Sequence, residues 1–306
     1  MIERTARWAV GIVVAAVVLL LGTMPGAAIA APITFNTALP VAQGQAIFRL
    51  QWKFVEFRGD RTSADRDLSV QVVPLVGVWG VTKRVALFGI LPLIDREVDL
   101  RTPLGRMRRS ASGLGDTTLL VRYTAYQRDE PGKTLRIAPF LGVEAPTGED
   151  SQSDSLGPLP PAFQLGSGSW DVQAGAILTR QALAWQTDVS LSYKLNGEAN
   201  DFEFGDQTRL DASYQRRLHP LHLEAGVPAY VYAVVESNLL WRDRSTFGGV
   251  EDVDTGGVIW YLAPGLQYVR RRFVVEGAVQ IPVAQNLDGS ALEDDFISTL
   301  SVRFNF

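Results

Sequence analysis

The chain has 306 residues, a formal net charge of −4 at pH 7 and no cysteine. The lack of cysteine excludes a disulfide framework and a thiolate nucleophile, and the slightly acidic balance argues against a nucleic-acid partner, which would require a basic face. Mean hydropathy is +0.06. Beyond the first residues no apolar run reaches the roughly 18 residues of a membrane-spanning helix, which argues against helical spans.

The N-terminus has the order of a secretory signal. Arg4 and Arg7 precede an apolar run from Trp8 to Leu21, and small residues follow up to Ala30. This pattern predicts a signal peptide cleaved after Ala30. The alternative is a permanent N-terminal membrane helix, for which the apolar run is short, since a span needs about 20 residues.

From about residue 45 onward, apolar and polar residues alternate at period two, the pattern of a β-strand with two different faces. Leu50 and Trp52, for example, alternate with Arg49, Gln51 and Lys53. Many segments approach the roughly 9–11 residues that a tilted membrane strand needs. We predict about twelve strands, at 45–57, 67–80, 84–99, 114–126, 134–146, 166–180, 185–197, 204–218, 221–240, 256–270, 273–285 and 293–306.

Loop lengths carry independent information. Connections after even-numbered strands are short, at 81–83, 181–184, 220 and 271–272, whereas those after odd-numbered strands are mostly long and polar, at 58–66, 100–113, 147–165, 242–255 and 286–292. Short turns at one end and long loops at the other are typical of outer-membrane barrels. A soluble periplasmic or secreted β protein, the main alternative, has no reason to separate loops in this way.

These patterns together predict an all-β fold, a transmembrane antiparallel up-and-down β-barrel in the outer membrane of a Gram-negative bacterium. We divide the chain into a signal peptide (1–30), an N-terminal periplasmic segment (31–44) and the barrel (45–306). An even strand number places both termini in the periplasm. The expected surroundings are outer-membrane lipids and lipopolysaccharide. Phe304 and Phe306, at the end of an alternating strand, resemble the C-terminal signal that the barrel-assembly machinery recognises.

The polar face of the strands carries charges of both signs. Because an Arg or Lys facing lipid at mid-bilayer costs about 2–4 kcal/mol, we expect these side chains to face the lumen. Their balance argues against strong ion selectivity, and the alternative to a conducting wall is a network of paired charges that fills a narrow lumen. The lumen-facing charges are predicted to be Arg49, Lys53, Arg122, Arg136, Glu144, Asp171, Asp188, Lys194, Arg209, Asp211, Glu224, Glu236, Glu276 and Arg303.

Three Gly-rich segments occur in a fixed order along the chain. Gly113-Leu114-Gly115-Asp116 opens a strand, Ala145-Pro146-Thr147-Gly148 closes another, and Gly166-Ser167-Gly168-Ser169-Trp170-Asp171 brings the chain back from the longest loop. As an ordered set they resemble a family of outer-membrane proteins named for the MetA pathway of phenol degradation. The resemblance implies an outer-membrane channel linked with uptake of hydrophobic or aromatic compounds. The glycines also have a structural explanation, because glycine tolerates positive φ and close backbone approach.

Catalytic and metal sites are not indicated. His219 and His222 are the only histidines, and no serine or metal-ligand spacing accompanies them. We therefore expect a non-enzymatic protein without cofactor or metal, whose partners besides the membrane and the assembly machinery are small organic solutes. The function favoured is a passive, substrate-preferring channel. The alternatives are a general small-solute porin, disfavoured by the small strand number, and a non-conducting structural or anchoring barrel.

Two further expectations concern access to the lumen. Loops as long as Thr147–Leu165 are usually functional or disordered, and we expect this one to restrict the extracellular mouth. Several prolines fall inside predicted strands, where they cannot donate to the ladder. They predict bulges, or alternatively a lateral gap through which an apolar substrate reaches the bilayer. Beside Pro228, Tyr230 and Tyr232 are candidate substrate contacts.

Overall fold

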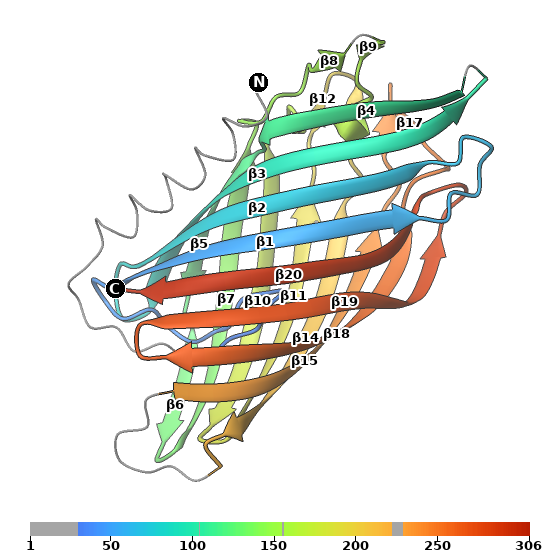
Figure 1. Ribbon diagram of the computed structural model, residues 1–306. Coiled ribbons are helices and arrows are strands. Elements are labelled where there is room, and N and C mark those ends of the chain that lie inside the picture. The colour runs from blue at the N-terminus through green and yellow to red at the C-terminus, as the bar shows by residue number, and fades with distance from the viewer. Residues whose placement is uncertain (1–29, 104, 155, 222–228) are drawn as a thin grey trace, which may run out of the picture.

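The computed structural model is a closed antiparallel β-barrel with strongly tilted strands (Figure 1). It describes residues 30–306 except 104, 155 and 222–228. No helix in this part of the chain is long and apolar enough to cross a membrane. In order around the wall, the strands are β1 (Ala46–Arg58), β2 (Asp67–Gly80), β3 (Val85–Thr102), β4 (Gly105–Leu114) with β5 (Thr117–Tyr123) and β6 (Tyr126–Glu130), β7 (Lys133–Ala145), β10 (Asp171–Ala182), β11 (Trp185–Leu195), β14 (Gln207–His219), β15 (Ala229–Arg242), β18 (Gly257–Arg270), β19 (Phe273–Leu287) and β20 (Glu293–Asn305).

The first and last strands close the barrel. β1 pairs antiparallel with both β2 and β20, so that Arg49 lies opposite Val76 on one side and Arg303 on the other. Beyond the ladder, Phe306 N–H donates to the Ala46 carbonyl at 2.9 Å. β4, β5 and β6 share one position in the wall, which gives twelve positions. Both ends of the barrel domain therefore lie at the end of the barrel that carries the short turns.

The two faces of the wall reverse the arrangement of a soluble protein. Outward-facing side chains such as Trp52 and Leu300 are large, apolar and exposed, with Leu300 at 65%. Inward-facing side chains such as Gln186, Gln215 and Gln267 are polar and almost fully buried. An apolar outer band around a polar interior is what the hydrocarbon layer of a membrane requires. The prediction of a transmembrane barrel of about twelve strands is confirmed.

The prediction of a loop at residues 100–113 is wrong. β3 continues to Thr102 and β4 returns beside it, in register from Leu93 opposite Leu114 to Thr102 opposite Gly105. Exposed residues of opposite charge form ion pairs across this hairpin, for example Arg108 with Asp99 at 3.2 Å. With polar residues on both faces, this hairpin has no alternation to detect. β4 pairs only with β3, so that its other edge has no strand neighbour among the described residues.

Short elements occupy the long loops. The sequence analysis predicted these stretches as loops, because strands of two residues have no periodic pattern. The strand expected from residue 166 begins only at Asp171, because the preceding residues turn to make the contacts described below. The short elements are β8 (Ser153–Asp154), β9 (Gly157–Pro158), η1 (Pro161–Phe163), β12 (Glu198–Ala199), β13 (Phe202–Glu203), β16 (Thr246–Phe247) and β17 (Val250–Glu251).

Prolines within the wall coincide with interruptions of the ladder. Pro74 lies opposite Pro92 in the β2–β3 register, and the β1–β2 pairing breaks off at Pro74, between Leu50 opposite Leu75 and Lys53 opposite Val72. Pro282 adjoins a register shift in the β18–β19 pair. These are the local irregularities that proline, lacking an N–H, produces in a sheet.

Candidate functional site

Residues 30–41, which we call the inner segment, run inside the barrel before β1 begins. Ile33 N–H donates to Glu236 on β15, Ala38 N–H donates to Thr179 on β10 at 2.8 Å, and Arg122 on β5 donates to the Leu39 carbonyl at 2.7 Å. These strands lie on different sides of the wall. The inner segment therefore crosses the lumen. The expectation that residues 31–44 form a segment in the periplasm is corrected accordingly.

Two carboxylates of the wall accept hydrogen bonds from N–H and hydroxyl groups of the inner segment. Glu236 accepts from the backbone N–H groups of Ile33 at 2.6 Å and Thr34 at 3.0 Å, and from the Thr34 hydroxyl at 2.5 Å. Asp188 accepts from the Thr37 hydroxyl at 2.8 Å. Buried backbone N–H groups need acceptors, and an ionised carboxylate is a strong one.

Wall cations and amides hold the carbonyl groups of the same segment. Arg49 donates to the Ile33 carbonyl at 2.6 Å and pairs with Glu276 at 2.7 Å. Arg122 donates to the carbonyls of Thr37 and Leu39, and Gln267 donates to that of Ala31. The lumen charges thus serve as backbone partners for an extended peptide that has no strand neighbour of its own.

The other predicted lumen charges lie on the inner face, in part far from the inner segment. Lys194 joins Glu144 at 2.8 Å and Asp171 at 3.0 Å near the long-loop end. Arg136 pairs with Asp129 at the short-turn rim, at 3.2 Å. Glu224 lies outside the described residues. The predicted charges not yet described also lie on the inner face, and they are Lys53, Arg209, Asp211 and Arg303.

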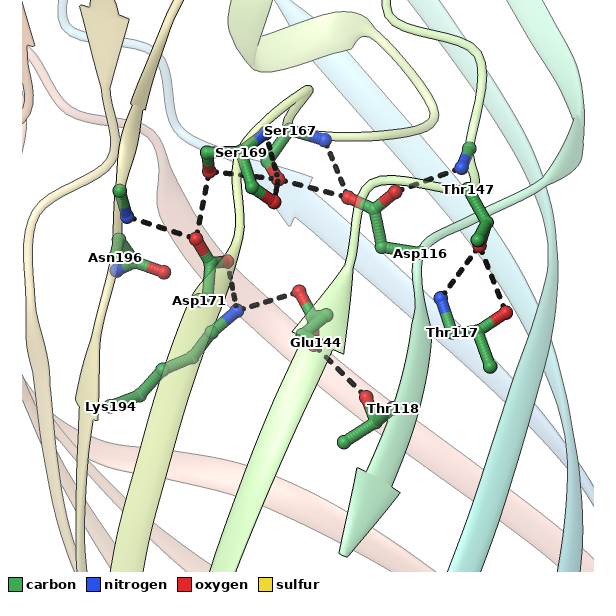
Figure 2. Close-up of polar contacts among 12 residues, drawn as sticks. Asp116, Thr117, Thr118, Glu144, Thr147, Ser167, Ser169, Asp171, Lys194 and Asn196 are labelled. Atoms are coloured by element: carbon green, nitrogen blue, oxygen red, sulfur yellow. Dashed lines mark hydrogen bonds and ion pairs between the residues drawn. The ribbon is translucent and has the colours of Figure 1, made fainter.

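At the long-loop end the Gly-rich motifs meet at Asp116 (Figure 2). Its carboxylate accepts from Gly148 N–H at 2.8 Å, Ser167 N–H at 2.6 Å and the Ser167 hydroxyl at 3.0 Å. The Thr147 hydroxyl accepts from Thr117 N–H at 2.9 Å. We call this group of residues the Asp116 clamp. It joins the start and the end of the longest loop to the start of β5.

Glycine is required where the two ends of that loop pass each other. A Cβ on Gly148 would lie 2.8 Å from the Gly166 Cα, and a Cβ on Gly166 would lie 2.7 Å from the Gly148 carbonyl oxygen. No side chain fits at such distances from backbone atoms. Gly168 has a φ of 75°, which also favours glycine.

The loop between β7 and β10 folds inward and packs on the β3–β4 hairpin. Leu159 and Leu165 form an apolar cluster with Ala111. Arg96, on the inner face of β3, donates to the Gln164 carbonyl at 2.7 Å. Farther out, Arg109 binds Asp154 at 2.8 Å, and its hydrogen-bonded guanidinium holds the pKa of that carboxyl below its usual range.

A family model described as "Putative MetA-pathway of phenol degradation" matches residues 51–274. The chain belongs to this family. Among solved structures, it is similar to the COG4313 outer membrane channel from Pseudomonas putida F1, with a TM-score of 0.68, 15% identity, and coverage of 90% of this chain and 100% of that one. The beta domain of the Bordetella autotransporter BrkA aligns with a TM-score of 0.45, 12% identity, and coverage of 86% and 100%. No curated protein sequence matches the chain.

In this member of the MetA-pathway family, the three motifs expected from the sequence come together at the long-loop end. Gly115 and Asp116 directly precede β5, Thr147 and Gly148 follow β7 and Pro146, and Ser167 precedes β10. Asp171 accepts from the Ser169 hydroxyl at 2.8 Å and from Gly197 N–H at 2.9 Å, which extends the clamp to the loop after β11. Gly113, at the end of β4, faces the Leu165 side chain.

The aromatic pair proposed from the sequence lies at the opposite end. Tyr230 and Tyr232 are on the inner face of β15, with ring centroids 6.4 Å apart. With Arg217 and Val269 they line a cavity of about 370 Å³ beside the short turns. Their neighbour Pro228 lies outside the described residues.

Within the described part of the chain, no group of three or more His, Cys, Asp or Glu side chains is arranged to hold a metal ion. His219 ends β14, and His222 is not described. The inner segment was missed by sequence reasoning. The sequence signal for it is the apolar Ile33, Leu39 and Val41, which are buried in a stretch expected to lie in the periplasm.

Proposed function

We propose that this family member is an outer-membrane channel of a Gram-negative bacterium for passive uptake of small, hydrophobic or aromatic organic molecules, with both termini in the periplasm. The observation that carries the proposal is a polar lumen crossed by a peptide held only through hydrogen bonds and side-chain packing, chiefly at Glu236 and Arg122. A permanently closed barrel could fill its lumen with wall side chains, whereas a segment held in this way can leave.

The comparisons support the channel and suggest its cargo. The similar Pseudomonas putida protein is described as an outer membrane channel, and the family description refers to phenol degradation. The short turns and both ends of the barrel domain lie at one end of the barrel, and this end faces the periplasm in the proposal, since long loops are extracellular in outer-membrane barrels. On this orientation Tyr230 and Tyr232 line the periplasmic exit.

The loop after β7 is the second closure in this proposal. It packs over the extracellular mouth through Arg96, Leu165 and the Asp116 clamp. Removing residues 151–163 and joining the ends with a short Gly-Ser linker retains the clamp and should raise single-channel conductance. Unchanged conductance would exclude this loop as a gate.

Liposome swelling separates the proposed channel from its alternatives. Proteoliposomes should admit phenol and benzyl alcohol faster than arabinose, although all three are small. Rates that follow solute size alone would indicate a general porin. No swelling with any solute, and no current in planar bilayers, would indicate a structural barrel. Gel mobility before and after boiling checks that the barrel is folded in each preparation.

A further inference from the structure

A cavity of about 490 Å³ lies between the inner segment and the wall formed by β20, β1, β2, β3 and β5. Much of its lining is apolar, with Phe35 and Leu39 from the inner segment and Ile47, Val76 and Phe88 from the wall. Its volume is within the range of small-molecule sites, about 300–1,000 Å³. One small organic molecule fits this space.

The charged part of the lining is cationic. Arg49, Arg122 and Arg303 all line the cavity, and none of the described residues that line it is Asp or Glu. The carboxylate that pairs with Arg49, Glu276, is buried behind it and is not part of the lining. The sign of the charge here thus differs from the balanced charge of the lumen as a whole.

Arg49 and Arg122 are held in place by their neighbours. Arg49 is fixed by Glu276 at 2.7 Å and by the Ser301 hydroxyl at 3.0 Å. Arg122 stacks over the Phe88 ring at 5.0 Å and donates to the Leu39 carbonyl. A guanidinium held beside an aromatic wall is prearranged for a ligand with an anionic head and an apolar body.

We propose that this cavity binds an amphipathic organic anion, a single carboxylate carried on an aromatic or short aliphatic body. The carboxylate would face the arginines and the body would contact Phe35, Val76 and Phe88. An uncharged ring would gain only the apolar contacts, and a cation of the same shape would be repelled. The inference deepens the proposed channel function and rests on it for the ligand's role as cargo, whereas binding is independent of conduction.

Isothermal titration calorimetry on the purified, folded barrel in detergent tests the proposal with four probes. Benzoate should bind at least about tenfold more tightly than benzyl alcohol, benzylamine or acetate, because it alone combines charge-assisted hydrogen bonds to the arginines with the apolar contacts of a ring. Equal affinity for benzoate and benzyl alcohol would overturn the anion site. Equal affinity for benzoate and acetate would overturn the apolar part of it.

Variants locate the site. Val76→Trp fills the cavity and leaves all the arginines in place, and Arg303→Gln removes one cation, so each should weaken benzoate binding at least about tenfold. Arg136→Gln is the matched control, since this inward arginine lies at the rim outside the cavity, and its affinity should equal that of the parent protein. Benzoate binding unaffected by Val76→Trp and Arg303→Gln would overturn the assignment.

Bilayer recordings on the same preparations separate the two proposals. Benzoate binding without any conductance would contradict the channel and leave the site standing. Conductance without benzoate binding would contradict the site and leave the channel standing.

Discussion

The backbone N–H of Ile33 donates to Oε1 of Glu236 at 2.6 Å, although the two residues are 203 positions apart in the chain. This bond joins the residues just before the first strand to the middle of β15. Glu236 is fully buried, and its second oxygen accepts from Thr34. The seating of the inner segment therefore depends on a carboxylate that the sequence identified as inward-facing for a different reason, its place on the polar face of an alternating strand.

Replacing Glu236 with Ala should release the inner segment. The N–H groups of Ile33 and Thr34 would lose their acceptor, and each unsatisfied buried donor costs about 1–3 kcal/mol. The equilibrium between seated and released segment should shift at least about tenfold toward release. Single-channel recordings should show a higher open probability. Glu56→Ala is the control, because Glu56 is also a buried carboxylate of the wall but lies on the face of β1 that carries Phe54 and bonds Ser69; if both variants open equally, Glu236 does not hold the closure.

Asp116→Ala should loosen the longest loop without opening the barrel wall. The substitution removes the shared acceptor of Gly148 and Ser167, at a cost of about 1–3 kcal/mol for each donor left buried. Limited proteolysis should cleave between residues 149 and 165 faster than in the parent. The Glu149→Ala variant, changed in the same loop, should be cleaved at the parental rate, because the Glu149 side chain bonds only Ser151 within the described residues. Equal protection of all three proteins would show that the clamp does not order the loop.

Phe304 and Phe306 should act in assembly rather than in folded stability. Their rings are 6.5 Å apart on the outward face at the end of the chain, where a terminal aromatic is accessible before the barrel closes. Replacing both with Ser should lower the yield of heat-modifiable barrel in outer-membrane fractions. Phe296→Ser, farther along β20 beside Phe54, should assemble at a higher yield than the double variant. The same yield for both would make the terminal aromatics incidental.

The strands could be predicted because the lipid and the lumen impose opposite chemistry on alternate residues, as Leu300 and Ser301 show in β20. β4 could not be predicted, because it is polar on both faces and so has no alternation. The inner segment could not be predicted either, because an extended peptide bound by side chains has no periodic pattern of apolar and polar residues. Its partners, such as Arg122 and Glu236, were found as inward charges, but what they bind depends on contacts across most of the chain.

The most direct test of the account is the conductance of the barrel with and without its inner segment. Planar bilayers should contain either the parent protein or a variant lacking residues 32–40, both exported with the native N-terminus and verified as folded by gel mobility. The account predicts brief, infrequent openings for the parent and a sustained, larger conductance for the variant. Identical recordings for the two proteins would contradict the claim that residues 30–41 close the lumen.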